Sequence, residues 1–211
     1  MVDAGSTYSF AFEIAGRMGM FMRPDTGSTP VSYPIPTGSA IKAMAESIAL
    51  VEGAWFRPIE IHVCQPIVYA AYATNYGGPL RKSDQIVKNA SFQHIARVLV
   101  DPCFKIYGEC VKSGWTDGND AAKKLQQMLE RRMDLGQSRF PVCLGWKEFA
   151  PTYFGLPRQT TQPDLSINDT IEGYLVGVWS SPQNGVWAPK FAEVRISAGI
   201  CSLKEAWLNA T

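Results

Sequence analysis

Apolar and polar residues alternate from Tyr8 to Ile14, and this period of two predicts a strand with one buried face. From Ser39 to Val51 the apolar positions instead recur at three- and four-residue spacing, which predicts an amphipathic helix. Ser39 is a candidate cap for its first turn, and Gly53 is a candidate stop beyond its last turn. The chain therefore opens with a strand followed by a helix.

Alternation returns at residues 59–63 and predicts a second strand. The segment from Thr74 to Asn89 is polar and contains glycines, so we expect a mobile hairpin or arm at about residues 73–90. A further strand is predicted from Ile95 to Ile106. A second helix follows, whose apolar stripe consists of Leu125, Met128, Leu129 and Met133.

The last part of the chain predicts an antiparallel hairpin. After a loop over residues 160–169, strand patterns run from Tyr174 to Trp179 and from Trp187 to Ile196, joined by a turn that contains Asn184-Gly185. The order of elements predicts an α+β fold with a ferredoxin-like core, an arm and this C-terminal β hairpin. We expect residues 1–156 to form the core domain and residues 157–211 to form an extension packed on it.

Composition narrows the functional classes. With 211 residues and 46% apolar content, the chain can bury a substantial core, and its net charge of +1 means that any RNA contact must come from local basic clusters. The five cysteines are scattered and odd in number, so we expect neither disulfides nor zinc, and a reducing cytoplasm. No stretch approaches the roughly 18 apolar residues of a membrane span. We expect no metal, no cofactor and no membrane contact.

One segment carries a recognisable motif. Arg131-Arg132 is followed by Gly136-Gln137, Pro141, Leu144-Gly145 and Lys147-Glu148-Phe149. These residues resemble the R-R-x-x-x-G-Q…P-Y-L-G-C-R-E-F signature of the Cas-five family of CRISPR proteins, in its type I-C branch.

Three further blocks agree with this resemblance, in the correct order. Residues 32–37, Ser-Tyr-Pro-Ile-Pro-Thr, are similar to the S-Y-P-x-P-T that precedes the family's first helix. Residues 99–102, with Phe104 and Ile106, are similar to the family's strand after its arm. Residues 189–191, Pro-Lys-Phe, lie where its C-terminal strand has a P-x-F. The resemblance therefore spans nearly the whole chain.

The resemblance implies a RAMP- or RRM-type ferredoxin-like fold and a function in antiviral defence. Such a subunit binds the 5′ handle of the guide RNA (crRNA), caps the backbone filament of a Cascade-type ribonucleoprotein complex, and docks a large subunit. The implied partners are therefore the crRNA, the backbone subunits and the large subunit. The target nucleic acid is reached through the complex.

The catalytic residues of the family are matched only in part. Type I-C members that cleave precursor guide RNA use a tyrosine late in the first helix and a lysine–histidine pair that opens the second. The resemblance places Ala49, Lys124 and Leu125 at these positions. Alanine and leucine cannot transfer protons, so we expect a non-catalytic subunit and a separate guide-processing endonuclease.

Two alternatives remain open. One is a metal-independent endoribonuclease in which Lys124 or Lys123 works with another residue, such as Tyr107 or His94. The other is a ferredoxin-like interaction module unrelated to CRISPR. Both histidines, His62 and His94, are more simply read as structural residues.

The candidate RNA contacts are basic residues of the arm and of the second helix, together with residues of the loop that follows it. Arginine binds phosphate through a planar fork and lysine as a point charge, while Trp146, Tyr72 or Tyr76 can stack on a base. The alternative is a solvated helix face that pairs with Glu130 and Asp134, an ordinary polar loop, and core packing of Trp146. The candidates are Arg81, Lys82, Lys88, Lys123, Lys124, Arg131, Arg132, Arg139, Trp146 and Lys147, with Lys124 catalytic if the chain is active.

Overall fold

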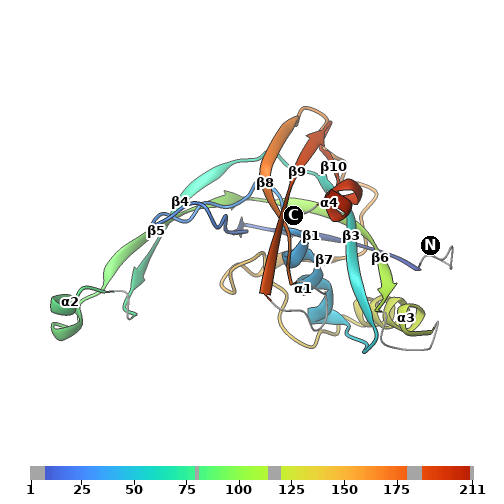
Figure 1. Ribbon diagram of the computed structural model, residues 1–211, viewed down its shortest axis with the longest axis horizontal. Helices are drawn as coiled ribbons and strands as arrows, with labels where there is room; N and C mark the ends of the chain where they lie inside the picture. Colours follow the sequence, from blue (N-terminus) through green and yellow to red (C-terminus); the bar gives the residue numbers. More distant parts are fainter. Residues whose placement is uncertain (1–7, 79–80, 114–119, 180–186, 210–211) are drawn as a thin grey trace.

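A computed structural model describes residues 8–78, 81–113, 120–179 and 187–209. It has the predicted α+β fold, in which the arm projects far from the body of the molecule (Figure 1). In chain order the elements are β1 Tyr8–Gly16, β2 Met18–Gly19, α1 Gly38–Ile48, β3 Ala54–Val63, β4 Tyr69–Tyr76, α2 Ser83–Val87, β5 Phe92–Val100, β6 Cys103–Lys112, α3 Asp120–Asp134, β7 Pro151–Gly155, β8 Asp169–Trp179, β9 Trp187–Ser197, β10 Ile200–Ser202 and α4 Lys204–Asn209.

The body is built on a seven-stranded sheet with the order β7-β1-β6-β3-β10-β9-β8. Strand β6 pairs antiparallel with both β1 and β3, so it separates the two parallel strands of a β1-α1-β3 unit. This is the split βαβ arrangement of a ferredoxin-like fold. The predicted alternation in β1 places Phe10, Phe12 and Ile14 in the core, where α1 and α3 cover the sheet.

The predicted strand from Ile95 to Ile106 is wrong as a single element. It is divided into β5, in the three-stranded arm sheet β2-β5-β4, and β6, in the main sheet. Asp101 separates them with a φ of 46°, and Pro102 has no N–H with which to continue a ladder. The chain therefore changes sheets at these two residues.

The arm is longer than predicted. Its strands β4 and β5 pair from Tyr69 opposite Leu99 to Tyr76 opposite Phe92, and the short helix α2 lies at the tip. A two-stranded ribbon is marginally stable alone, so its base depends on the contact with β2 and the body. That the arm is mobile stays a prediction.

The predicted ends of the first helix are also corrected. Thr37, not Ser39, is the N-cap, because its backbone is extended and its side chain accepts a hydrogen bond from the N–H of Ala40 at 3.1 Å. The helix ends at Ile48, before Val51, and Gly53 with a φ of 83° shapes the turn into β3.

The C-terminal hairpin continues the main sheet. Strands β8 and β9 pair antiparallel, and β10 pairs with both β9 and β3. Strand β8 begins at Asp169, earlier than predicted, and the Tyr174 hydroxyl donates to the carbonyl of Pro36 at 2.8 Å. The predicted Asn184-Gly185 turn lies outside the described residues. The division at residue 156 stays a prediction.

A buried ion cluster fixes the loop between β7 and β8 to the sheet. Glu13 is fully buried and accepts hydrogen bonds from the Arg158 side chain at 2.9 and 2.5 Å and from Thr161 at 3.0 Å. The buried Lys105 ammonium donates to the carbonyls of Arg158 and Thr161. Burial raises the pKa of the Glu13 carboxyl, but these hydrogen bonds outweigh it and hold the pKa below its usual value. We call this group the Glu13 cluster.

No helix in the described part of the chain is both long and apolar enough to cross a membrane.

Candidate nucleic-acid interface

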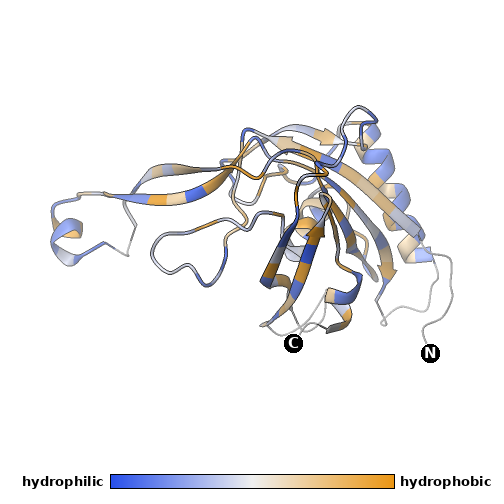
Figure 2. Ribbon diagram, turned by 90° about the horizontal axis from the view of Figure 1, so that it is seen from above, coloured by the Kyte–Doolittle hydropathy of each residue, from blue (hydrophilic) through white to orange (hydrophobic). Residues whose placement is uncertain are grey.

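Helix α3 presents one apolar and one polar side. Ala122, Leu125 and Leu129 are buried against the body, while Lys124 and Arg131 are exposed. Two helical turns span about seven residues, so Lys124 and Arg131 lie on the same side of the helix. Figure 2 shows hydrophilic residues over much of α3. The predicted basic face of this helix is therefore present.

The basic face borders an open groove. Three of the predicted RNA-binding residues converge there with two glutamines and two apolar residues. The lining residues are Val51, Lys124, Gln127, Met128, Arg131, Arg132 and Gln137, which we call the basic groove. Lys123 is exposed on the same helix but does not line the groove.

The cations of the groove differ in what they contact. Arg132 is half-buried, and its guanidinium donates to the carbonyl of Ile48 at 2.6 Å, which joins α3 to the end of α1. Its own carbonyl accepts from the N–H of Gln137 at 2.8 Å. Within the described residues, neither Lys124 nor Arg131 lies within ion-pair distance of a carboxylate. The suggested pairing with Glu130 and Asp134 does not form.

The positions that the resemblance assigns to the catalytic tyrosine and histidine are in the core. Ala49 and Leu125 are both fully buried. Apolar side chains cannot accept or donate a proton, so of those three positions only Lys124 offers a titratable group to the groove. His62 instead lies 2.7 Å from Glu60 and beside the Tyr107 ring, and His94 is on the arm near Tyr76.

Among the described residues of the arm, one of the three predicted cations is engaged by the arm's own backbone and the other two are exposed. The Arg81 side chain donates to the carbonyls of Gly78 at 3.1 Å and Ala90 at 2.7 Å, so it closes the tip of the arm. Lys82 and Lys88, at the two ends of α2, are exposed.

The loop between α3 and β7 connects the basic groove to the arm. Trp146 stacks on Phe149 with ring centroids 5.9 Å apart and meets Tyr72 of the arm at 6.5 Å. Gly145, with a φ of 87°, lies against the Met20 carbonyl, where any Cβ would collide. Leu144 is fully buried, so the Leu-Gly pair of the signature has a structural cause. Arg139 and Lys147 are exposed on this loop.

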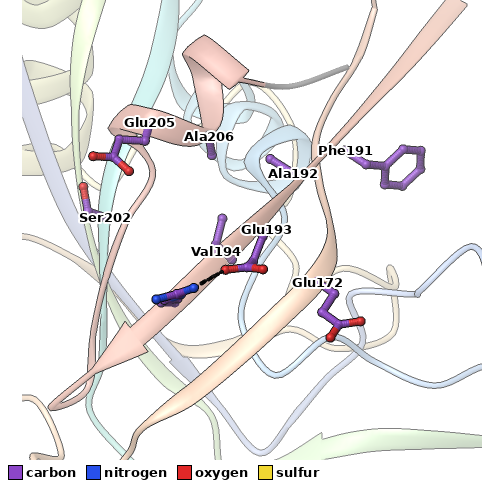
Figure 3. A pocket seen from close by; sticks show the side chains of 9 residues that line it. Glu172, Phe191, Ala192, Glu193, Val194, Ser202, Glu205 and Ala206 are labelled. Atoms are coloured by element: carbon purple, nitrogen blue, oxygen red, sulfur yellow. Dashed lines mark hydrogen bonds and ion pairs between the residues drawn. The ribbon is translucent and has the colours of Figure 1, made fainter.

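The predicted set omits two groups of residues. Gln127 and Gln137 line the basic groove, and Gln137 could have been found because it follows Gly136 in the signature. The other group lines an acidic hollow on the C-terminal strands and α4, which holds Glu172, Glu193 and Glu205 (Figure 3). Among its described lining residues, Arg195 is the one cation. Arg195 donates to Glu193 at 2.9 Å. The hollow is lined by Glu172, Phe191, Ala192, Glu193, Val194, Arg195, Ser202, Glu205 and Ala206.

Comparison with known proteins shows which sequences and folds the chain is similar to. No family model matches it. It is 27% identical over 157 residues to the CRISPR pre-crRNA endoribonuclease Cas5d of Thermus thermophilus, which covers 74% of this chain and 67% of the relative. A crystal structure of a CRISPR-associated protein matches with a TM-score of 0.67 and 18% identity, over 95% of each chain. A functionally uncharacterized protein from Streptococcus mutans matches with a TM-score of 0.65 and 16% identity, over 93% of this chain and 92% of that protein.

The structural matches show a shared fold, and the sequence match covers most of this chain. Together with the four ordered sequence blocks, they support the resemblance to the Cas5 family. The chain is similar in sequence to a Cas5d protein and shares the fold of a CRISPR-associated protein.

Proposed function

We propose that this protein is the subunit of a Cascade-type CRISPR complex that binds the 5′ handle of the crRNA and caps the backbone filament. One observation carries the proposal: the basic groove holds two exposed cations free of acidic partners among the described residues, while Ala49 and Leu125 are buried. The groove is thus suited to holding phosphates and poorly equipped for acid–base chemistry.

The positions of the exposed cations support local contacts with RNA phosphates. Lys124 and Arg131 are about two helical turns apart, or roughly 10 Å along the axis, so they can contact different phosphates of one strand. Gln127 and Gln137 line the same groove and add neutral hydrogen-bonding groups. Lys82 and Lys88 on the arm can contact the same RNA at a distance from the groove. Such local phosphate contacts are compatible with a net charge of +1 for the whole chain.

The second candidate function is cleavage of precursor crRNA. The Thermus relative carries that activity in its name, and Lys124 lines the groove. Cleavage by the ribose 2′-hydroxyl needs a proton acceptor and a proton donor, each typically worth about 10²–10⁴-fold in rate. The partners considered from sequence are placed elsewhere: the Tyr107 ring lies beside His62, and His94 lies on the arm. The non-catalytic function is therefore favoured.

The partners follow from the same proposal. Backbone subunits, a large subunit and a separate guide-processing endonuclease would complete the complex, and the target nucleic acid would reach this chain only through it. A cytoplasmic location fits such a complex. The third interpretation, an interaction module unrelated to CRISPR, is disfavoured by the sequence similarity to Cas5d.

The test uses the precursor repeat RNA of the same CRISPR locus in EDTA. We expect the protein to bind RNA that contains the handle and not to cleave it. The affinity should fall about tenfold in Arg131→Ala, because one charge-assisted phosphate contact is lost. Lys204→Ala, which removes an exposed cation of α4 outside the groove, is the matched control and should bind like the wild type.

Specific cleavage that disappears in Lys124→Ala would contradict the non-catalytic proposal and make Lys124 a catalytic residue. Equal binding of handle RNA and a scrambled RNA would contradict the handle-binding proposal itself.

A further inference from the structure

A second groove lies between α1 and the loop that precedes β7. Helix α1 contributes Ala40, Ala43 and Met44, and the loop contributes Pro141 and Val142. Ser47, Cys143 and Gly145 complete the lining. We call it the apolar groove.

The few polar groups of the apolar groove are already engaged. The Ser47 hydroxyl donates to the carbonyl of Met44 at 2.6 Å, and the Cys143 thiol donates to the carbonyl of Gly145 at 3.5 Å. Such a lining offers contact area for a flat apolar surface and little that orients a polar ligand.

Positive charge flanks the apolar groove at both ends of its loop wall. At one end, the N–H groups of Arg139 and Phe140 both donate to the Ser47 carbonyl, at 2.7 and 3.1 Å. The Arg139 guanidinium lies 5.5 Å from the centre of the Phe140 ring, which is 62% exposed. At the other end, burial raises the pKa of the Cys143 thiol, the nearby Lys147 charge opposes that rise, and the Glu148 carboxylate adds to it. An apolar groove between two exposed cations suits a base held between two phosphates.

The apolar groove also joins the two surfaces already assigned to RNA. On the arm side, Trp146 follows the lining residue Gly145 and contacts Tyr72. On the other side, the lining residue Ser47 precedes Ile48, whose carbonyl accepts from Arg132 of the basic groove. A strand that runs from the arm to α3 therefore passes this groove.

We propose that the apolar groove is a nucleobase subsite, which takes one unstacked base of the bound single-stranded RNA while Arg139 and Lys147 contact the flanking phosphates. This rests on the proposed function, because it deepens the account of the same RNA. Burial of the apolar face of a base against an apolar wall is favourable, provided that the polar edges of the base stay in contact with water. The subsite therefore selects an extruded base by position in the strand and only weakly by base identity.

The test combines a protein variant with abasic RNA. Ala43 is exposed on α1, so Ala43→Phe fills the apolar groove without entering the core, and Ala43→Ser is the matched control. In the wild type, an abasic nucleotide at one handle position should weaken binding on the order of tenfold. In Ala43→Phe, intact RNA should bind about as weakly, and the abasic nucleotide should have no additional effect.

A cross-link gives a readout that does not depend on affinity. Cys143 is half-exposed, whereas the other four cysteines, Cys64, Cys103, Cys110 and Cys201, are buried. RNA that carries an activated disulfide tether on the extruded base should exchange with Cys143, forming an RNA–protein disulfide and releasing the activating thiol. The RNA–protein product should be absent in Cys143→Ser.

The outcomes separate the two proposals. If handle RNA binds but Ala43→Phe binds as tightly as Ala43→Ser, the subsite is wrong and the proposed function stands. If handle RNA is not distinguished from scrambled RNA, the proposed function fails first. Tight RNA binding by Ala43→Phe together with loss of its association with other subunits would assign the groove to a protein side chain and also contradict the subsite.

Discussion

The basic groove and the acidic hollow lie on different elements and carry opposite charge. In the groove, Lys124 and Arg131 have no carboxylate within ion-pair distance among the described residues. In the hollow, Glu172, Glu193 and Glu205 line the same space, and Arg195, the one cation among the described lining residues, pairs with Glu193. The net charge of +1 is a sum over the whole chain and does not reveal that one surface is suited to attract RNA and another to repel it.

The Glu13 cluster sharpens this comparison, because there a fully buried carboxylate is paired with Arg158, whose side chain is 42% exposed. Glu13→Ala would leave the buried Lys105 without the nearby carboxylate and release Arg158 and Thr161. We expect the free energy of unfolding to fall by about 3 kcal/mol, measured by urea denaturation. Glu193→Ala in the hollow is the control, with a change within about 0.5 kcal/mol. Equal losses in the two variants would contradict the distinction.

Charge reversal tests the groove against the hollow directly. We expect the double variant Lys124→Glu and Arg131→Glu to bind handle RNA about 100-fold more weakly, which corresponds to about 2.7 kcal/mol, because two attractive contacts become repulsive. Glu193→Lys with Glu205→Lys should not weaken binding. The RNA affinities of both double variants are measured by titration at one fixed salt concentration. A loss caused by the reversed hollow would show that RNA follows that surface instead.

The pH dependence of stability separates the Glu13 cluster from both surfaces. The folded-state pKa of Glu13 lies below the ordinary value of 4.5, so its contribution to stability is complete above that value and is lost as the pH falls through the folded pKa. We expect the unfolding free energy of the wild type to decrease over this acidic range. The decrease should be smaller in Glu13→Gln, measured by denaturation at a series of pH values. Identical slopes for the two proteins would contradict the role of Glu13.

The smallest effect is expected in the hollow. The ion pair of Arg195 and Glu193 is solvent-exposed, at 76% and 48% of the two side chains, so it contributes little. We expect Arg195→Ala to change the unfolding free energy by less than about 0.5 kcal/mol, measured by thermal denaturation. It should also leave handle binding unchanged. A tenfold loss of RNA affinity would mean that this single cation of the hollow contacts RNA.

The sequence predicted elements whose signal is local. The alternation in β1 and the stripe of α3 are such signals, and both elements lie where they were expected. The split of residues 95–106 into β5 and β6 was missed, because apolar residues continue through the position where the chain changes sheets. The edge strand β7 and the three-residue β10 are defined by their partners, and no periodicity reveals a partner.

The sequence predicted which residue types form the candidate site, but not which of them are exposed to RNA and which are engaged by the protein itself. Charge identified Arg81, Arg131 and Arg132 equally, yet Arg81 closes the arm tip and Arg132 holds α1, while Arg131 remains exposed. These differences arise from backbone carbonyls brought close by folding, such as those of Ala90 and Ile48, which carry no sequence signature. The apolar groove was missed for the same reason, because its two walls are about 100 positions apart in the chain.

The most direct test of the central claim is lysine footprinting of the full chain, with and without handle RNA, read by mass spectrometry. The account predicts that acetylation of Lys124 in the basic groove decreases strongly when RNA is bound, while Lys204 on α4 reacts equally in both samples. Protection of Lys204 without protection of Lys124 would contradict it.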